Sequence, residues 1–310
     1  MSSKPEITPQ MQSHFIQVDE LRIHYREVLP FQETDAPPIL LLHGFPTSSL
    51  LWRNIMPVLG RKQRVIAVDL PGYGESDKPL NVSYSFRYYQ RFLDRFLDSL
   101  GLAQINLVVH DTGGPIGAYW AVHRTDRVRQ LAMLNTLVFS DFSWAVMAFL
   151  FSCKLPGIRS LLASPWGLKT SLYLGMNHHE KVDEELIQQI QTPFTEKRAR
   201  KALLKAGVGL TPAGFKDLEK LLAGLTMPVG IFYGAKDLIL PDMPKTAERL
   251  IAMLPDVSVV SLPECGHFLQ EDDPEQVSAL LADFFEGTQS NGISPEEKTE
   301  ASVKGEVLPL

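Results

Sequence analysis

Short apolar runs alternate with amphipathic stretches between about residues 38 and 134. The runs PPILLLHG, RVIAVDLPG, INLVVHD and VRQLAMLN predict buried strands, and the segment YSFRYYQRFLDRFLDSL has apolar residues at helical spacing. Strands that alternate with helices predict a mainly parallel sheet with helices on both faces. The preceding stretches HFIQVDE and LRIHYREV predict an antiparallel pair at the edge of that sheet.

The alternation stops after Leu134 and resumes with PVGIFYGAKD, which begins at Pro228. It continues with VSVVSLPECGH and a last helix near DDPEQV, where Asp273 can cap the helix and Pro274 suits its first position. The interruption is rich in Leu, Phe, Trp and Met, and it predicts a mainly helical cap inserted into one α/β domain. We expect core segments at 13–135 and 226–286, a cap at 136–225 and a disordered tail at 287–310.

The overall charge excludes some partners. The 310 residues carry a formal charge of −6 with no basic block, which argues against a nucleic-acid partner. Cys153 and Cys265 lie far apart without metal-ligand spacing, so they predict free thiols, no metal site and a cytoplasmic location.

No segment predicts stable insertion into a membrane. The opening MSSKPEITPQ lacks the apolar core of a signal peptide. The longest apolar run, FSWAVMAFLFSC from Phe142, is shorter than the roughly 18 residues expected of a spanning helix. We interpret this run as part of a lid over a lipophilic substrate.

The stretch VVHDTGG places Asp111 between an apolar strand and a helical segment, which is the context of a nucleophile elbow. Gly113 and Gly114 leave space for the sharp turn. Asp237 follows the first sheet strand after the interruption, and His267 follows the next one. The order Asp111, Asp237, His267 is that of nucleophile, acid and histidine in an α/β-hydrolase. The alternatives are a helix cap for Asp111, a turn for Asp237 and a structural role for His267.

The motif HGFP follows another buried strand, where it predicts a second hydrogen-bond donor for an oxyanion hole. We expect the backbone N–H groups of Phe45 and Thr112 to converge on one oxygen.

Four motifs, HGFPTSSLLWRNIMP, DLPGYGESDKP, VVHDTGG and CGHFLQEDDPEQV, resemble those of the α/β-hydrolase superfamily, specifically its haloalkane dehalogenase and epoxide hydrolase branches. The resemblance covers about residues 38 to 285. It implies the α/β-hydrolase fold, with the nucleophile on Asp111, the base on His267 and the supporting acid on Asp237.

An aspartate nucleophile favours displacement at a saturated carbon, with a halide or an epoxide oxygen as the leaving atom. Attack on an ordinary ester would instead form a less favourable anhydride. After displacement, His267, oriented by Asp237, would activate water to hydrolyse the ester on Asp111. The expected partners are therefore a lipophilic small molecule and water, and no metal or organic cofactor is needed.

The leaving group depends on the residues around the nucleophile. Dehalogenases resemble one another in placing Trp directly after the nucleophile, with an Asn or a cap Trp as a second halide donor. This chain has Thr112 and Phe45 at the first two of these positions. Trp144 or Trp166 in the cap could replace part of the halide site, although packing is the simpler role for both.

Epoxide hydrolases resemble this chain in HGFP and HDxGG, and they protonate the opening oxygen with cap tyrosines or with a Tyr and a His. Here Tyr173 is available, with His178 and His179 nearby, and packing is the alternative role for Tyr173. Because both usual halide donors are missing, the sequence favours epoxide hydrolase over haloalkane dehalogenase. A hydrolase of another strained ring, such as a β-lactone, and a binding protein without activity remain alternatives.

Overall fold

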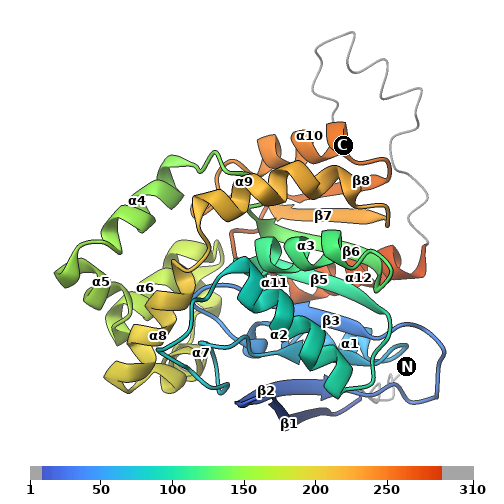
Figure 1. The fold of residues 1–310 in the computed structure, drawn as a ribbon, viewed down its shortest axis with the longest axis horizontal. Helices are drawn as coiled ribbons and strands as arrows, with labels where there is room; N and C mark the ends of the chain where they lie inside the picture. The colour runs from blue at the N-terminus through green and yellow to red at the C-terminus, as the bar shows by residue number, and fades with distance from the viewer. Residues whose placement is uncertain (1–8, 288–310) are drawn as a thin grey trace, which may run out of the picture.

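The centre of the molecule is an eight-stranded sheet, and the computed structural model describes residues 9–287. The strands are β1 (Met11–Val18), β2 (Leu21–Val28), β3 (Ile39–Leu42), β4 (Val65–Val68), β5 (Ile105–Asp111), β6 (Val128–Thr136), β7 (Val229–Gly234) and β8 (Val257–Leu262). Their order is β1-β2-β4-β3-β5-β6-β7-β8 (Figure 1). β2 pairs antiparallel with β1 and β4, and all other neighbours are parallel. The predicted sheet is confirmed, including its antiparallel edge pair.

Helices cover both faces of this sheet. The connections β3 to β4 and β4 to β5 run in opposite directions, so right-handed crossovers place their helices on opposite faces. One face carries α2 (Phe86–Ser99) against α3 (Gly113–His123), and the other carries α1 (Met56–Leu59) against α12 (Pro274–Glu286). α10 (Met243–Met253) packs on β8, and α11 (Leu269–Asp272) precedes α12.

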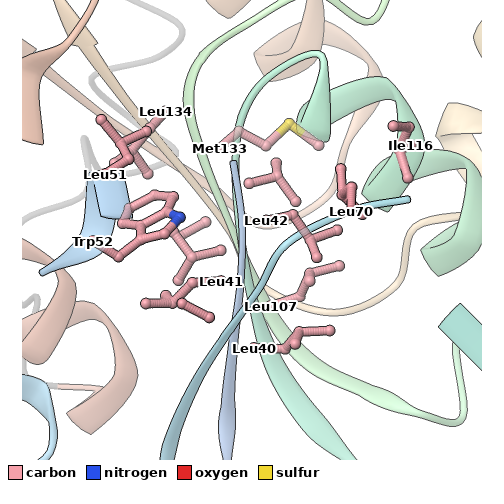
Figure 2. Close-up of a cluster of buried hydrophobic side chains, with 14 of the residues drawn as sticks. Leu40, Leu41, Leu42, Leu51, Trp52, Leu70, Leu107, Ile116, Met133 and Leu134 are labelled. Carbon is pink, nitrogen blue, oxygen red and sulfur yellow. The ribbon is translucent and has the colours of Figure 1, made fainter. Parts of the chain in front are cut away.

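The strands are apolar because both faces are covered. Every residue of β3 and β4 is buried. Figure 2 shows Leu41 on the same side of the sheet as Trp52, while Leu40 and Leu42 lie on the other side with Ile116. Alternating side chains therefore serve two apolar layers, as expected of a sheet buried on both faces.

The predicted helical insertion lies between β6 and β7. Residues 137–228 are all described, and they contain no strand. Their α-helices are α4 (Trp144–Ser152), α5 (Pro156–Leu162), α6 (Pro165–Gly175), α7 (Glu184–Gln191), α8 (Lys197–Gly207) and α9 (Pro212–Leu221). Figure 1 shows α4 to α8 beyond one end of the sheet, whereas α9 packs against α3. The limits 136–225 for the cap, and those of the two core segments, remain a prediction.

Within residues 9–287, four short 3-10 helices complete the secondary structure, at Ser49–Trp52, His179–Lys181, Thr192–Phe194 and Leu222–Gly224. The predicted start of α12 is confirmed, since the Asp273 side chain accepts a hydrogen bond from the backbone N–H of Gln276 at 3.0 Å. Gly287 ends α12 in the left-handed conformation, and the rest of the predicted tail lies outside the described residues.

None of the helices within residues 9–287 is long and apolar enough to cross a membrane by itself. α4 and α5, which meet at a bend of 110°, satisfy the length and composition criteria only when taken together.

Candidate active site

Asp111 is the last residue of β5 and lies directly before the turn into α3. Its φ of 49° is in the left-handed region, which a residue with a side chain rarely adopts. Two glycines make room for this turn. A Cβ atom on Gly44 would lie 2.3 Å from the Cβ of Asp111, and one on Gly113 would lie 2.4 Å from the carbonyl oxygen of His43. The predicted strand, turn and helix therefore occur as expected at Asp111.

The predicted backbone donors converge on the Asp111 carboxylate. The N–H of Phe45 donates to Asp111 Oδ1 at 2.6 Å. The backbone N–H of Thr112 also donates a hydrogen bond to this carboxylate, which helps to lower the pKa of Asp111. Because α3 begins at Gly113, its N-terminus adds a favourable dipole for negative charge at the same point.

The structure brings His267 and Asp237 to Asp111 from two other loops. His267 Nδ1 lies 2.8 Å from Asp237 Oδ2, within hydrogen-bond distance. His267 Nε2 lies 3.6 Å from Asp111 Oδ2, which is longer than a direct hydrogen bond. The imidazole thus stands between two carboxylates, in the order that the sequence predicted.

A residue that sequence reasoning missed, Asn135 at the end of β6, holds Asp237 in place. The side-chain NH₂ group of Asn135 donates to Asp237 Oδ2. Its side-chain oxygen, Oδ1, accepts from the Gly234 N–H at 2.9 Å. The other oxygen, Asp237 Oδ1, accepts from the N–H groups of Ile239 and Leu240 at 2.7 and 2.8 Å. The signal available in the sequence was a polar residue directly after the buried run LAML.

Burial and charge act in opposite directions on the pKa values of this cluster. Burial favours the neutral form of His267, but the carboxylates of Asp237 and Asp111 raise its pKa to about 10. Burial also opposes ionisation of Asp111, yet the hydrogen bond and charge of His267 lower its pKa below the ordinary value. Burial and the neighbouring His267 lower the pKa of His110 to about 3, so this second imidazole stays neutral. The two carboxylates therefore favour the protonated form of His267, and His267 in turn favours their ionised forms.

The loop that carries His267 is tied to the end of α6 by the buried carboxylate of Asp272. Its Oδ2 accepts from the Gly266 N–H at 2.7 Å, and its Oδ1 accepts from the His178 N–H at 2.8 Å. In addition, the Phe268 N–H donates to the Gly175 carbonyl oxygen at 3.0 Å. The N–H groups of His178 and Phe268 thus join the cap to the His267 loop, whereas that of Gly266 holds Asp272 within the loop.

A cavity of about 260 Å³ lies over Asp111, between the sheet and the cap. Its wall is apolar, with Leu, Ile, Val and Phe side chains from α4, α6 and the loop after Asp237. The hydroxyl groups of Thr170 and Ser171 donate to carbonyl oxygens of their own helix, at 2.8 and 2.7 Å. Among the described residues that line the cavity, Asp111 is the only one with a titratable side chain.

The predicted cap residues divide into two groups. Trp166 lines the cavity. Trp144 does not, and 77% of its surface is exposed. Tyr173 packs edge to face against His179, with the ring centres 5.6 Å apart, and His178 Nδ1 lies 3.0 Å from a Glu180 carboxylate oxygen. The structure therefore does not place Tyr173, His178 or His179 in the wall of the cavity over Asp111.

Comparisons with known proteins agree with this geometry. The sequence profile of the alpha/beta hydrolase fold family matches residues 37–274. Haloalkane dehalogenase 2 from Mycobacterium tuberculosis is 31% identical over 292 residues, with 91% of this chain and 97% of the relative covered. The chain belongs to the α/β-hydrolase superfamily, in its haloalkane dehalogenase branch. It is accordingly a hydrolase of the haloalkane dehalogenase type.

Solved structures of similar fold include a haloalkane dehalogenase. The crystal structure of the haloalkane dehalogenase DbeA from Bradyrhizobium elkani has a TM-score of 0.79 and 29% identity, over 91% of this chain and 99% of that one. Cfl2 from Burkholderia cenocepacia has a TM-score of 0.78 and 27% identity, over 91% and 98% of the two chains.

The immediate surroundings of Asp111 contain few side-chain hydrogen-bond donors. Phe45 offers only its backbone N–H, because its side chain has no hydrogen-bond donor. The hydroxyl group of Thr112 is buried and lies close to the buried phenol of Tyr73. Those residues also contain no group of three or more His, Cys, Asp or Glu that could hold a metal ion.

Proposed function

We propose that this enzyme hydrolyses a carbon–halogen bond of a small lipophilic haloalkane through an ester formed on Asp111. One observation carries the choice of halide: Asp111 is the only titratable side chain among the described residues that line the cavity. A halide leaves as a stable anion and needs no proton. An epoxide oxygen leaves as a strongly basic alkoxide and requires an acid that faces it, whereas His267 is fully buried beside Asp111 and does not line the cavity.

The first step is displacement at the carbon that bears the halogen. An Asp111 carboxylate oxygen supplies the electron pair that forms the new C–O bond, and the halogen departs with the electrons of the C–X bond. The lowered pKa of Asp111 keeps this carboxylate ionised. The Thr112 hydroxyl and the Trp166 indole are the candidate donors to the departing halide, because both residues line the cavity.

The second step depends on a change in the charge around His267. Once Asp111 is an ester, one of the two carboxylates that raise the pKa of His267 is neutral. The pKa of His267 then falls, and the imidazole can release its proton and act as a base. It takes a proton from water, and the hydroxide attacks the carboxyl carbon of Asp111.

The tetrahedral intermediate carries its negative charge on an oxygen of Asp111. The Phe45 N–H already donates to Asp111 Oδ1, so the donor is in place before the charge develops. Collapse of the intermediate breaks the bond to the alcohol oxygen, which takes a proton from His267. The alcohol, the halide and one proton are released, and the Asp111 carboxylate is restored.

A preference for epoxides, which the sequence suggested, has less support in the cavity. The candidate proton donors Tyr173, His178 and His179 lie outside its wall. The relatives named as haloalkane dehalogenases also favour a halide. A cytoplasmic location is part of the proposal, supported by the unpaired thiols of Cys153 and Cys265.

The test is to trap the ester. His267→Gln removes the base for the second step, and intact mass is measured after incubation with a panel of bromoalkanes and a panel of epoxides. We expect the protein to gain the mass of the alkyl group and to release one bromide per active site. Asp111→Asn is the control, and it should gain nothing.

The two panels separate the possible results. Adducts from epoxides but not from bromoalkanes would show that the enzyme opens epoxides and would contradict the proposal. Modification by neither panel would remove the support for an ester on Asp111.

A further inference from the structure

Two cap helices have an apolar surface that the protein does not bury. α4 has the sequence WAVMAFLFS, with a single polar residue. Neither α4 nor α5 contains a buried residue. A helix that is apolar on all sides normally lies inside a protein or a membrane. Figure 1 shows α4 and α5 projecting from the molecule, away from the sheet.

The two faces of α4 have different surroundings. Residues 145, 146, 149 and 150 line the cavity over Asp111. Residues 144, 147, 148 and 151 are exposed on the opposite face, including Trp144 at 77% and Phe151 at 63%. The substrate cavity therefore accounts for one apolar face of α4 and leaves the other without a partner.

Exposed apolar side chains are concentrated in this part of the molecule. Sixteen large apolar residues are exposed between residues 9 and 287, and nine of them lie in 144–174. On α4, α5 and the bend between them they are Trp144, Met147, Phe151, Leu155, Ile158 and Leu161. We call these six residues the cap face. A cluster of exposed apolar side chains of this kind is typical of an interaction surface.

The charge around the cap face has one sign. The chain as a whole carries −6, but it has no Asp or Glu between Asp141 and Glu180. Lys154 and Arg159 are both exposed within this stretch. Lys169 pairs with Glu184 at 3.5 Å, whereas no ion pair involves Lys154 or Arg159 within residues 9–287. The surface is apolar, basic and free of acidic groups.

We propose that the cap face binds reversibly to a lipid bilayer with anionic headgroups. The apolar side chains enter the boundary between headgroups and acyl chains, and Lys154 and Arg159 contact the anionic headgroups. A second copy of this chain fits less well, because a symmetric contact would bring the same basic residues face to face. This binding does not depend on the proposed chemistry at Asp111.

The cap face and the substrate cavity lie on opposite sides of α4. α4 separates the bilayer on one side from the cavity on the other. A lipophilic molecule dissolved in the bilayer therefore has a short path to Asp111 that avoids water. This consequence rests on the proposed function, whereas the binding itself is tested without any substrate.

The experiment measures binding of the full chain to vesicles by flotation. The vesicles contain phosphatidylcholine alone or phosphatidylcholine with phosphatidylglycerol. We expect clear binding to the anionic vesicles, weakened by salt. Brominated lipids should quench tryptophan emission, because Trp144 and Trp166 are exposed and Trp52 and Trp120 are fully buried.

The decisive variant is the double substitution Phe151→Ser and Ile158→Ser, which should weaken binding to anionic vesicles by at least about tenfold. Lys154→Gln and Arg159→Gln should each weaken it about fivefold. The matched control is Leu29→Ser with Phe31→Ser, which changes two residues of 49% and 56% exposure. They follow the end of β2, at the start of the parallel strands and opposite the cap.

Each result decides the proposal. Binding that is lost in the cap-face variant and kept in the control supports it, with the thermal unfolding midpoint showing that both variants fold. No binding to either vesicle, or equal binding by all variants, overturns it. A concentration-dependent dimer that the cap-face variant abolishes would also overturn it, because the occupant would then be a second copy.

Discussion

Apolar residues are buried in the strands that lead to the active site, but they are left unburied in the outer helices of the cap. Every residue of β3, β4 and β5 is buried, and at the strand ends Asp237 is hydrogen-bonded to both Asn135 and His267. In α4 and α5 no residue is buried, although nearly all of them are apolar. The strand ends fix the reacting groups, and the cap provides a surface whose partners lie outside the protein.

Substitutions in these two regions should therefore have different effects. A change at the strand ends alters a dense set of hydrogen bonds and close contacts, so it should affect turnover or folding strongly. A change in the cap alters contacts with the substrate or with another surface, and it should leave folding almost unchanged.

The largest effect is expected at Asp237. In Asp237→Asn the imidazole of His267 loses a carboxylate that raises its pKa and fixes its orientation. We expect turnover to fall by a factor on the order of 10⁴, with a burst of one halide per site because the first step needs only Asp111. Rapid-quench measurement of halide release checks this. The control Asp217→Asn changes an exposed carboxylate on α9 and should behave as the wild type.

Gly44 tests the close packing at the strand ends. In Gly44→Ala the new Cβ atom would lie 2.3 Å from the Cβ of Asp111, so either the turn or Asp111 must move. We expect a loss of about 1–3 kcal/mol in the free energy of unfolding, together with a loss of turnover. Denaturant unfolding measures the first quantity. Gly224→Ala is the matched control, since its Cβ atom would meet nothing within 4 Å, and an unchanged Gly44→Ala variant would contradict the description of this turn.

The raised pKa of His267 predicts a pH dependence of stability. Its value of about 10 in the folded protein lies above the ordinary value of 6.5, so the bound proton stabilises the folded state. This contribution is complete below about pH 6.5 and is lost as the pH rises through about 10. The difference in unfolding free energy between the wild type and His267→Gln should therefore shrink over this range. A difference that stays constant would show that His267 is not protonated at rest.

The smallest effect is expected at Phe149, which lines the cavity from α4. Its ring centre lies 5.2 Å from that of Phe45. Phe149→Ala should change KM for short haloalkanes by about tenfold or less, with little change in stability. Steady-state kinetics with substrates of different chain length measure this. Met147→Ala, on the exposed face of the same helix, should leave KM for a water-dissolved substrate unchanged. A large loss of stability in either variant would contradict the distinction between the two regions.

The sequence predicted the strand ends well because their signals are local. Asp111 follows an apolar run and precedes two glycines, and the structure has the expected strand, turn and helix at these residues. The mainly parallel sheet was predictable from the alternation along the chain, whereas the order of its strands was not predicted. Asn135 was missed because it continues a strand in the sequence, and its contact with Asp237 spans 102 residues.

The cap was harder to predict because its helices carry no such signals. α4 is apolar on both faces, so its sequence does not show which face is turned to the cavity. The positions of Tyr173, His178 and His179 depend on how α6 ends and on the hydrogen bonds of Asp272, which is distant in the sequence. Whether Trp166 contacts a leaving group remains a prediction, as do the limits of the cap.

The carboxylate of Asp272 has a consequence for exchanging parts between relatives. It binds Gly266, beside His267, and His178, just after α6, so the end of the insertion helps to position the catalytic loop. A chimaera that replaces the whole insertion would remove the His178 donor and the Gly175 carbonyl group along with the substrate-facing helices. Grafts that keep residues 175–178 and exchange only α4, α5 and most of α6 preserve the loop. The boundary for recombination therefore lies inside the cap rather than at its junctions with the sheet.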